Sequence, residues 1–422
     1  MVSLTSQIEA GKTAFDILDL RSLSERDRRR AERLVQEVVK RFGVPEEDVR
    51  LVRSPYRIAP LGAHVDHQLG RVTGVAIDRS TLLAFAPNPS GRVRLERFNF
   101  PGRVEFDVRD IPPKRDGDWG NYARGAALAL QEHYRIEVGI DGVLEGNMPI
   151  GGLSSSASVG LAYLLALEYA NGLKILVKDN ISLDRFIENV YIGLNNGILD
   201  QSAILLSRRD KLMYLDTATE DYHLYEVPPV MPDFEFVVVY SGVSKGLVGT
   251  GYNRRVAECE EAARLLLQKA GLEVPERPKL RHVPEEVFDK YLDTLPEVLA
   301  RRARHFYTEN QRVRQGLEYW QRGDLENFGK LMNASGRSSI QDYESGSPPL
   351  IAIYEILTQT DGVFGARFSG AGFRGNCIGL VDPAYREAIR VRVLEEYPKR
   401  FPEYADKVAV DFCSTDDGVR LL

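Results

Sequence analysis

The stretch from Gly146 to Ser158 constrains the fold of this chain more than any other segment. It reads GNMPIGGLSSSAS, and an apolar run, VGLAYLLAL, follows directly. Adjacent glycines let the backbone approach a ligand closely because they lack a Cβ atom. The serines then open a helix, whose free N–H groups and positive dipole end favour an anion. We therefore predict a tight turn, a helix and a phosphate-binding site at their junction, formed by Gly151, Gly152, Leu153, Ser154, Ser155 and Ser156.

The alternative for this stretch is an ordinary serine-capped helix. One serine would fit that alternative well, but two glycines followed by three serines fit it poorly.

Length and composition bound the remaining possibilities. A chain of 422 residues predicts two domains, and a proline-rich segment, PPVMP, favours a boundary that gives domains 1–228 and 229–422. The net charge of −6 argues against a nucleic-acid or membrane partner. We see no secretory signal, no apolar run long enough to span a membrane and only three dispersed cysteines, so a cytoplasmic location is expected. No feature indicates an oligomeric state.

Periodicity predicts the main helices and strands. Apolar residues recur at helical spacing before Gly43, and short β-branched runs alternate with Gly and Pro turns. We predict helices at 24–42, 121–133 and 182–194, the last with Ser182 as its cap, and a mostly helical region at 284–333 with turns at Gly316 and Gly323. The predicted strands are 72–77, 81–85, 93–98 and 234–240.

Two groups of polar residues are candidates for chemistry. Arg57, His64, Asp66 and His67 cluster within one short segment, for which a plain polar loop and a functional site are equally good interpretations. Glu188 and Asp200 would lie about 18 Å apart on a continuous helix. The sequence Asn195-Asn196-Gly197 breaks that helix, so both carboxylates can face one site.

Three segments, in this order, resemble the GHMP small-molecule kinases, the family of the galactokinases, homoserine kinases and mevalonate kinases. They are Arg57–Gln68, Gly151–Ser158 and Gly370–Gly375. The GGLSSSAS form is similar to that of galactokinases, and the wording APLGAHVDHQ and FSGAGFRG looks most like the galacturonokinase branch. Shorter matches, such as WGNY, GILDQ and GYNRR, spread the resemblance over nearly the whole chain.

The resemblance implies an α+β, two-domain fold with the active site between the domains, and it assigns roles. Asp200 matches the catalytic aspartate that faces the anomeric hydroxyl of a sugar, and Arg57 matches the arginine beside it. Ser156 and Glu188 match the Mg²⁺ ligands, and Trp119 matches an aromatic residue of the adenine pocket of ATP. His64, Asp66, Gly197 and Tyr252 match sugar contacts.

Physical chemistry agrees with these roles. Phosphoryl transfer passes through a loose, anionic transition state, so catalysis consists mainly of positioning and charge stabilisation. Magnesium needs few protein oxygens, because it keeps waters and binds ATP phosphates. Asp200 can accept the proton of the hydroxyl, or only orient it, with Arg57 favouring its ionised form.

One departure from the galactokinases bears on the substrate. They carry a glutamate that contacts the C6 hydroxyl of the sugar, and here that position is Ala63. A glutamate about 4 Å from the carboxylate of a uronic acid would repel it by about 4 kcal/mol at an effective dielectric constant of 20. His67 and Gln68 also depart, from Tyr and Asn. The alternative is drift at a tolerant position.

The predicted function is ATP- and Mg²⁺-dependent phosphorylation of D-galacturonate to α-D-galacturonate 1-phosphate. A galactokinase and a non-catalytic sugar sensor are the alternatives. The carboxylate of the substrate should meet a cation or N–H donors. The candidates are Arg374, Lys245 and a protonated His64 or His67.

Overall fold

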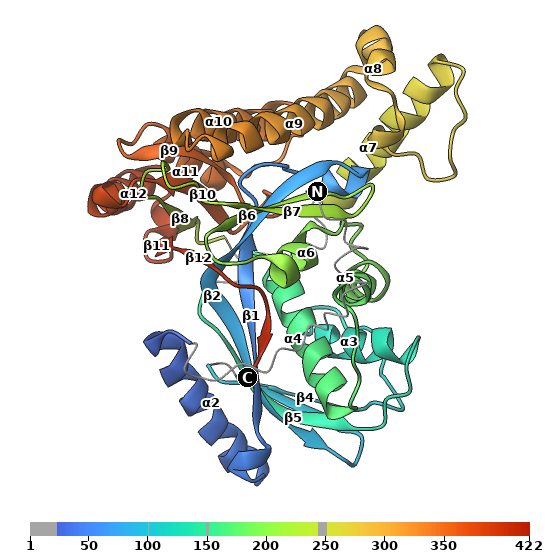
Figure 1. Cartoon of the computed structure of the whole chain (residues 1–422), viewed down its shortest axis with the longest axis vertical. Helices are drawn as coiled ribbons and strands as arrows, with labels where there is room; N and C mark the ends of the chain where they lie inside the picture. Colours follow the sequence, from blue (N-terminus) through green and yellow to red (C-terminus); the bar gives the residue numbers. More distant parts are fainter. Residues whose placement is uncertain (1–22, 100, 149–151, 244–250) are drawn as a thin grey trace.

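The computed structural model describes residues 23–99, 101–148, 152–243 and 251–422, and contains two sheets (Figure 1). The first is nine-stranded, with a central path in the order β13-β1-β2-β5-β3-β4. The strands of this path are β1 (Arg50–Ile58), β2 (Arg71–Asn88), β3 (Arg92–Arg97), β4 (Arg103–Asp107), β5 (Gly139–Gly146) and β13 (Arg420–Leu421). A hairpin of β6 (Lys211–Asp216) and β7 (Asp221–Glu226) joins the sheet through the pairing of β6 with β2. Because strands and helices form separate layers, the α+β prediction is confirmed.

Helices cover both faces of this sheet. Helix α2 (Glu25–Phe42) begins at the Ser24 cap, ends at Gly43, and packs Leu34 and Val38 against one face. The opposite face carries α3 (Asn121–Gln131), α4 (Ser155–Ala170), α5 (Val177–Phe186) and α6 (Leu199–Leu206) (Figure 1). Helices α4 and α6, which carry Ser156 and Asp200, therefore lie on the face of the sheet opposite α2.

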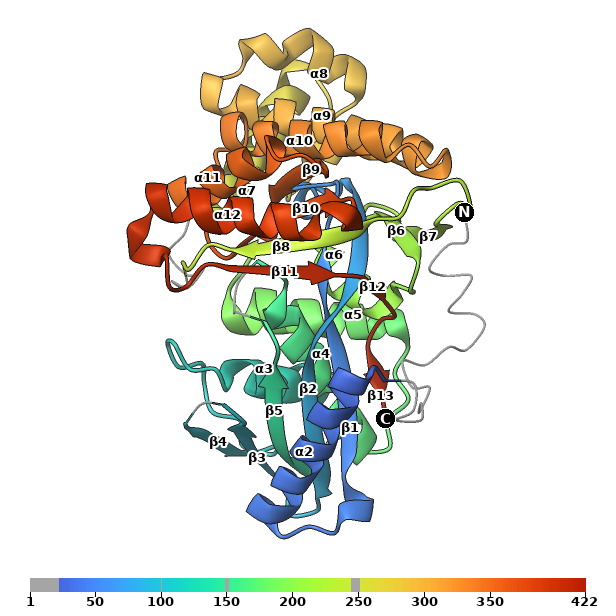
Figure 2. The ribbon, with the colours of Figure 1, turned by 90° about the vertical axis from the view of Figure 1, so that its left-hand side faces the viewer.

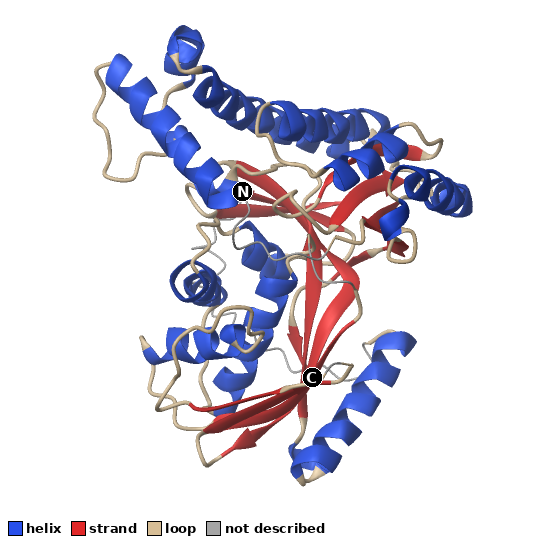
Figure 3. Ribbon diagram, turned by 180° about the vertical axis from the view of Figure 1, so that it is seen from behind, coloured by secondary structure: helices blue, strands red, loops and turns tan. Residues whose placement is uncertain are grey.

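The second sheet is four-stranded, in the order β11-β8-β10-β9, and lies above the first in Figure 2. Its strands are β8 (Glu235–Tyr240), β9 (Val363–Phe368), β10 (Asn376–Val381) and β11 (Ala409–Cys413). Helices α11 (Pro348–Thr358) and α12 (Arg386–Arg400) bury a core against it. Helices α7 (Tyr252–Lys269), α8 (Glu285–Tyr291), α9 (Glu297–Gln321) and α10 (Leu325–Gln341) form the outer layer (Figure 3).

The chain returns to the first sheet after β11. Strand β12 (Thr415–Asp416) pairs with β2, and β13 pairs with β1. Buried Arg53 on β1 joins an early helix to a late strand, because it contacts Asp27 of α2 at 2.8 Å and Asp416 of β12 at 2.6 Å.

Three local predictions are wrong. The strands expected at 72–77 and 81–85 form one strand, β2, which is long enough to pair with β1, β5 and β6. Gly316 is not a turn but lies inside α9, where a Cβ atom would come within 2.3 Å of the Leu61 side chain. Ser182 does not cap a helix, because α5 already begins at Val177. None of the helices in the described ranges is long and apolar enough to cross a membrane.

Candidate active site

The three segments singled out in the sequence meet in space. The Arg57 N–H donates to the Leu153 carbonyl at 3.3 Å, which ties the first segment to the second. Gly152, at φ 76°, lies so close to the third segment that a Cβ atom would be 2.9 Å from the Asn376 nitrogen. A Cβ atom on Gly370 would in turn be 2.9 Å from Gly152 Cα. These contacts require glycine on both loops.

The predicted anion-binding turn leads into α4 as expected. The helix begins at Ser155, after buried Leu153 and after Ser154 in the left-handed region at φ 53°. Ser156 lies in the first turn of α4, where backbone N–H groups lack helical acceptors. Burial raises the pKa of Tyr122 on α3, and Ser156 lowers it. Gly151 lies outside the described residues.

Asp200 and Arg57 form a close ion pair. Asp200 stands in the first turn of α6, and its Oδ1 accepts from Arg57 Nε at 2.8 Å and Nη2 at 2.5 Å. Arg57 projects from the end of β1 and is buried, whereas Asp200 keeps 22% of its side chain exposed. The pair therefore offers a partly accessible carboxylate on a fixed cationic support.

Glu188 lies next to this pair. It stands on a π-helical turn, Ile187–Ile192, which continues α5, and Asn196 donates a hydrogen bond to its Oε2. Burial and the negative charge of Asp200 raise the pKa of Glu188 to about 7, while the Ser156 hydroxyl lowers it. The sequence break at Asn195–Gly197 thus brings the two carboxylates together, as expected.

The residues around Ser156 fit a divalent cation. The Glu188 Oε1 atom is buried, and no group in the described part of the chain hydrogen-bonds it. The Ser156 hydroxyl and the Glu188 carboxylate, with one oxygen unsatisfied, form the kind of oxygen set that Mg²⁺ accepts alongside phosphates.

A third carboxylate, Asp66, lies near Asp200. It opens a short 3₁₀ turn and accepts from the Leu199 N–H at 3.4 Å, and burial and the charge of Asp200 raise its pKa to about 6. Gly197 allows this approach, because a Cβ atom there would come within 2.5 Å of Asp66 Oδ2. Tyr252 opens α7 nearby, and burial and the charge of Asp66 raise its pKa.

Helix α9 holds the loop that carries Ala63. The buried Glu309 carboxylate accepts the N–H groups of Gly62 at 2.8 Å and Ala63 at 3.0 Å, and His305 Nε2 lies 2.8 Å from the Ala63 carbonyl. Arg312 at 2.6 Å compensates the charge of Glu309, whose pKa is lowered. The backbone of Ala63 is therefore fully bonded, and only its methyl group remains to shape the site.

Burial disfavours protonated histidines as partners for a substrate carboxylate. Burial lowers the pKa of His64 well below its usual range and that of His67 to about 3. His64, at φ 55°, hydrogen-bonds Ser345 at 3.2 Å and stacks on Tyr343. Arg374 lies where it lowers the pKa of Tyr122, on the Ser156 side of the site, and Lys245 lies outside the described residues.

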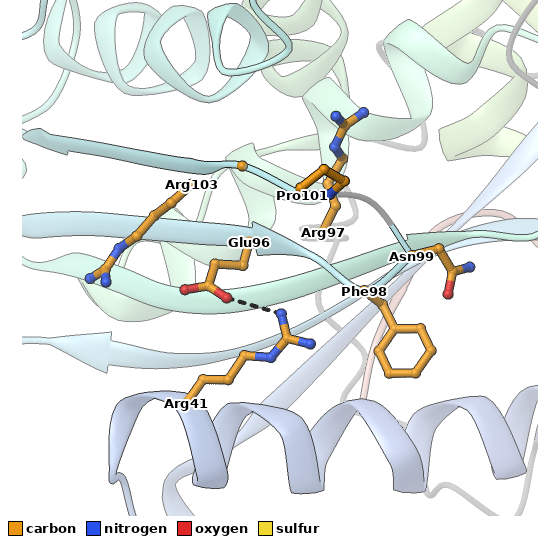
Figure 4. A pocket seen from close by; sticks show the side chains of 8 residues that line it. Arg41, Glu96, Arg97, Phe98, Asn99, Pro101 and Arg103 are labelled. Carbon is orange, nitrogen blue, oxygen red and sulfur yellow. Dashed lines mark hydrogen bonds and ion pairs between the residues drawn. The ribbon is translucent and has the colours of Figure 1, made fainter.

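Trp119 precedes α3, and the Arg97 guanidinium lies over its ring at 5.1 Å. Arg97 also lines a pocket of about 640 Å³ between α2 and the β3–β4 hairpin (Figure 4). An Arg41–Glu96 ion pair at 2.9 Å crosses this pocket. None of the three clustered carboxylates lines it, so this pocket lies apart from the chemistry.

Several residues of the site escaped prediction. Tyr122 and Asn196 lay within quoted segments, WGNY and the Asn-Asn-Gly break, and their polar groups could have marked them. His305 and Glu309 gave no such signal, because they stand on one face of a helix far along the chain from the loop they hold.

Comparisons with known proteins find similar sequences over most of the chain. Family models match at residues 121–208 (GHMP kinases N terminal domain), 317–399 (GHMP kinases C terminal) and 38–87 (galactokinase galactose-binding signature). The galacturonokinase of Arabidopsis thaliana is 45% identical over 91% of this chain and 96% of its own length. The galactokinase of Staphylococcus carnosus is 34% identical over 87% and 94%.

Solved structures extend the likeness. Lactococcus lactis galactokinase complexed with galactose superposes with a TM-score of 0.84 at 31% identity, covering 91% of this chain and 98% of that chain. The Methanococcus jannaschii mevalonate kinase shares the fold, with a TM-score of 0.62 at 16% identity over 88% of this chain and 100% of that chain.

Proposed function

Because this chain belongs to the GHMP kinases, as a sugar-1-kinase of the galactokinase family, we propose that it phosphorylates the anomeric hydroxyl of D-galacturonate. The γ-phosphoryl group of ATP passes to O1, ADP leaves, and α-D-galacturonate 1-phosphate forms. The observation that carries this choice is Ala63, which leaves the C6 side of the site without an acidic side chain from this position.

Each of the clustered residues has a separate role in this proposal. Asp200 accepts a hydrogen bond from the anomeric hydroxyl, and Arg57 holds that carboxylate in place. The turn before α4 and the first N–H groups of that helix bind the phosphates. Asp66, His64, Gly197 and Tyr252 contact the sugar, and Trp119 contacts the adenine ring.

Ser156 and Glu188 would hold Mg²⁺ in this site. The cation supplies positive charge against the phosphates of ATP. The chain itself contributes the two oxygen ligands and keeps them next to Asp200.

The same site supports galactose as a second candidate, because the superposed galactokinase is complexed with galactose and the galactokinase signature covers the Ala63 loop. Coupled ADP release with MgATP and galacturonate, galactose, glucuronate or glucose tests the choice. We expect a strong preference for galacturonate. A preference for galactose would refute the substrate, and no release with any sugar would favour the sensor.

A further inference from the structure

A chain of hydrogen bonds runs through His67 and Gln68, the neighbours at which this sequence departs from the galactokinases. The backbone N–H of Leu280 donates to Gln68 Oε1 at 3.1 Å. Gln68 Nε2 lies 3.0 Å from His67 Nδ1, and His67 Nε2 lies 3.0 Å from the Tyr343 hydroxyl. All three side chains are buried.

Two backbone groups fix the direction of this chain. The Leu280 N–H can only donate, so the oxygen of the Gln68 amide must face it. The His67 carbonyl can only accept, and Gln68 Nε2 donates to it at 3.2 Å. If the amide were turned over, its NH₂ group would face the Leu280 N–H and its oxygen would face the His67 carbonyl. Gln68 Nε2 therefore donates to His67 Nδ1.

The same reasoning sets the direction of the hydrogen bond between His67 and Tyr343. A neutral imidazole whose Nδ1 accepts carries its hydrogen on Nε2, so His67 donates to the Tyr343 oxygen. The Tyr343 hydroxyl must then donate its own hydrogen elsewhere. In the described part of the chain this hydroxyl has no other hydrogen-bond partner, although its side chain is fully buried. A buried donor of this kind calls for an acceptor.

The Tyr343 side chain packs against residues that are assigned to the proposed sugar site. The Tyr343 ring stacks on His64, with centroids 4.3 Å apart and planes at 2°, and His64 directly follows Ala63. His67, the hydrogen-bond partner of the Tyr343 hydroxyl, meets the ring of Tyr252 edge-on at 6.0 Å. Burial and the neighbouring Tyr252 and Asp66 raise the pKa of Tyr343, so it remains a protonated donor.

We propose that Tyr343 donates a hydrogen bond to the carboxylate of a hexuronic acid bound in this site, with His67 and Gln68 as the positioning residues that fix it as a donor. The inference rests on the proposed function, and it names a specificity residue that Ala63 alone does not supply. Removal of repulsion at Ala63 and donation by Tyr343 are complementary, because the first admits the carboxylate and the second binds it. A neutral donor can serve here because hydrogen bonds to charged acceptors are the strong ones.

Calorimetric binding of galacturonate and of galactose to wild type and Tyr343→Phe tests the proposal. The variant keeps the ring and its stacking but lacks the hydroxyl. We expect the Kd for galacturonate to rise about 10- to 100-fold and the Kd for galactose to stay within about threefold. The matched control is Tyr354→Phe, whose buried hydroxyl donates to the Asn333 carbonyl at 2.7 Å, and it should change neither Kd.

The outcomes separate the two proposals. Wild type that binds and phosphorylates galactose in preference to galacturonate would refute the proposed function. Wild type that prefers galacturonate, with Tyr343→Phe weakening both sugars equally or neither, would refute the role of Tyr343 alone.

A measurement on the wild-type protein tests the inference even if Tyr343→Phe fails to fold. Long-range ¹H–¹⁵N spectra report the tautomer of His67, assigned by its loss in His67→Asn. We expect the hydrogen on Nε2. A hydrogen on Nδ1 would reverse the chain, make Tyr343 a donor to His67, and overturn the inference.

Discussion

Asp200 is the side chain on which the proposed chemistry depends most directly. Asp200→Asn keeps the size of the group and its place beside Arg57 but cannot accept the hydroxyl proton. We expect turnover to fall by about 10³-fold or more, with sugar binding changed only a few-fold. ADP release and calorimetry measure the two quantities.

Asp221→Asn on β7 is the control, because it makes the same exchange away from the carboxylate cluster. Near-normal turnover in Asp200→Asn would show that another residue has the assigned role.

Ala63 gives a second prediction at this scale. Ala63→Glu places a carboxylate about 4 Å from that of galacturonate, and the repulsion of about 4 kcal/mol lowers kcat/KM for galacturonate by up to about a thousandfold. Galactose, which has no charge at C6, should lose far less. Ala63→Gln is the control of equal size, so similar losses in the two variants would show that volume rather than charge decides.

The clustered site residues differ in how far the sequence predicts them. Asp200, Asp66 and Glu188 could be predicted because each lies in a short segment with a recognisable pattern. Glu309 and Tyr343 could not, since each acts across a large separation in sequence on the Ala63–Gln68 loop. Only the packing of α9 and the residues after α10 against that loop reveals them.

At the scale of elements, the turn before α4 depends on Gly152. Gly152→Ala adds a Cβ atom 2.9 Å from the Asn376 nitrogen and 3.1 Å from the Ser369 carbonyl, both backbone groups. The loop must shift, so we expect the KM for ATP to rise about tenfold and stability to fall by about 1–3 kcal/mol. ADP release at varied ATP and urea unfolding measure both effects.

The same helix offers a matched control. Gly172, just past the other end of α4, has a similar φ of 63° but open space around its Cβ position. Gly172→Ala should therefore lower the stability only by the backbone cost of about 1 kcal/mol and leave the KM for ATP unchanged. An equal change in KM for both variants would contradict a specific role for the Gly152 turn.

Element boundaries show where local patterns fail. The expected break between the strands 72–77 and 81–85 does not occur, because β2 runs through it. Gly316 lies inside α9, where the Leu61 side chain occupies the space that a Cβ atom would fill. The start of α4 followed from the sequence because its glycines and serines act locally.

At the scale of the whole molecule, the buried Arg53 cluster joins α2, the first sheet and the returning end of the chain. Asp416→Asn leaves the Arg53 and Arg420 charges partly uncompensated, so we expect a loss of about 3–5 kcal/mol in the free energy of unfolding, measured with urea. Asp417→Asn is the control, because that side chain is 38% exposed and lies 3.9 Å from Arg420. Equal losses would argue against the cluster as the cause.

A buried acid outside the site contributes to the pH dependence of global stability. Burial raises the pKa of Glu168, on α4, to about 8 from an ordinary value of 4.5. Between these values the unfolded chain releases the proton while the folded chain keeps it, so this contribution to stability falls as pH rises, by up to about 1.4 kcal/mol per pH unit.

Glu168→Gln removes the titrating group and keeps the shape. We therefore expect the stability of this variant relative to wild type to increase between pH 5.5 and 7.5, measured by urea unfolding. The exposed Glu132→Gln should show no such trend, and a constant difference for Glu168→Gln would contradict the raised pKa.

The pairing of β12 with β2 and of β13 with β1 has a consequence for synthesis. Strands β1 and β2 are synthesised long before residues 415–421. Until then Arg53 has only one of its two carboxylate partners, Asp27, because Asp416 has not been synthesised. A nascent chain can assemble most of the first sheet but cannot complete it until translation has passed β11. An interrupted translation product would therefore lack the last strands, β12 and β13, which pair with β2 and with the strand that carries Arg57.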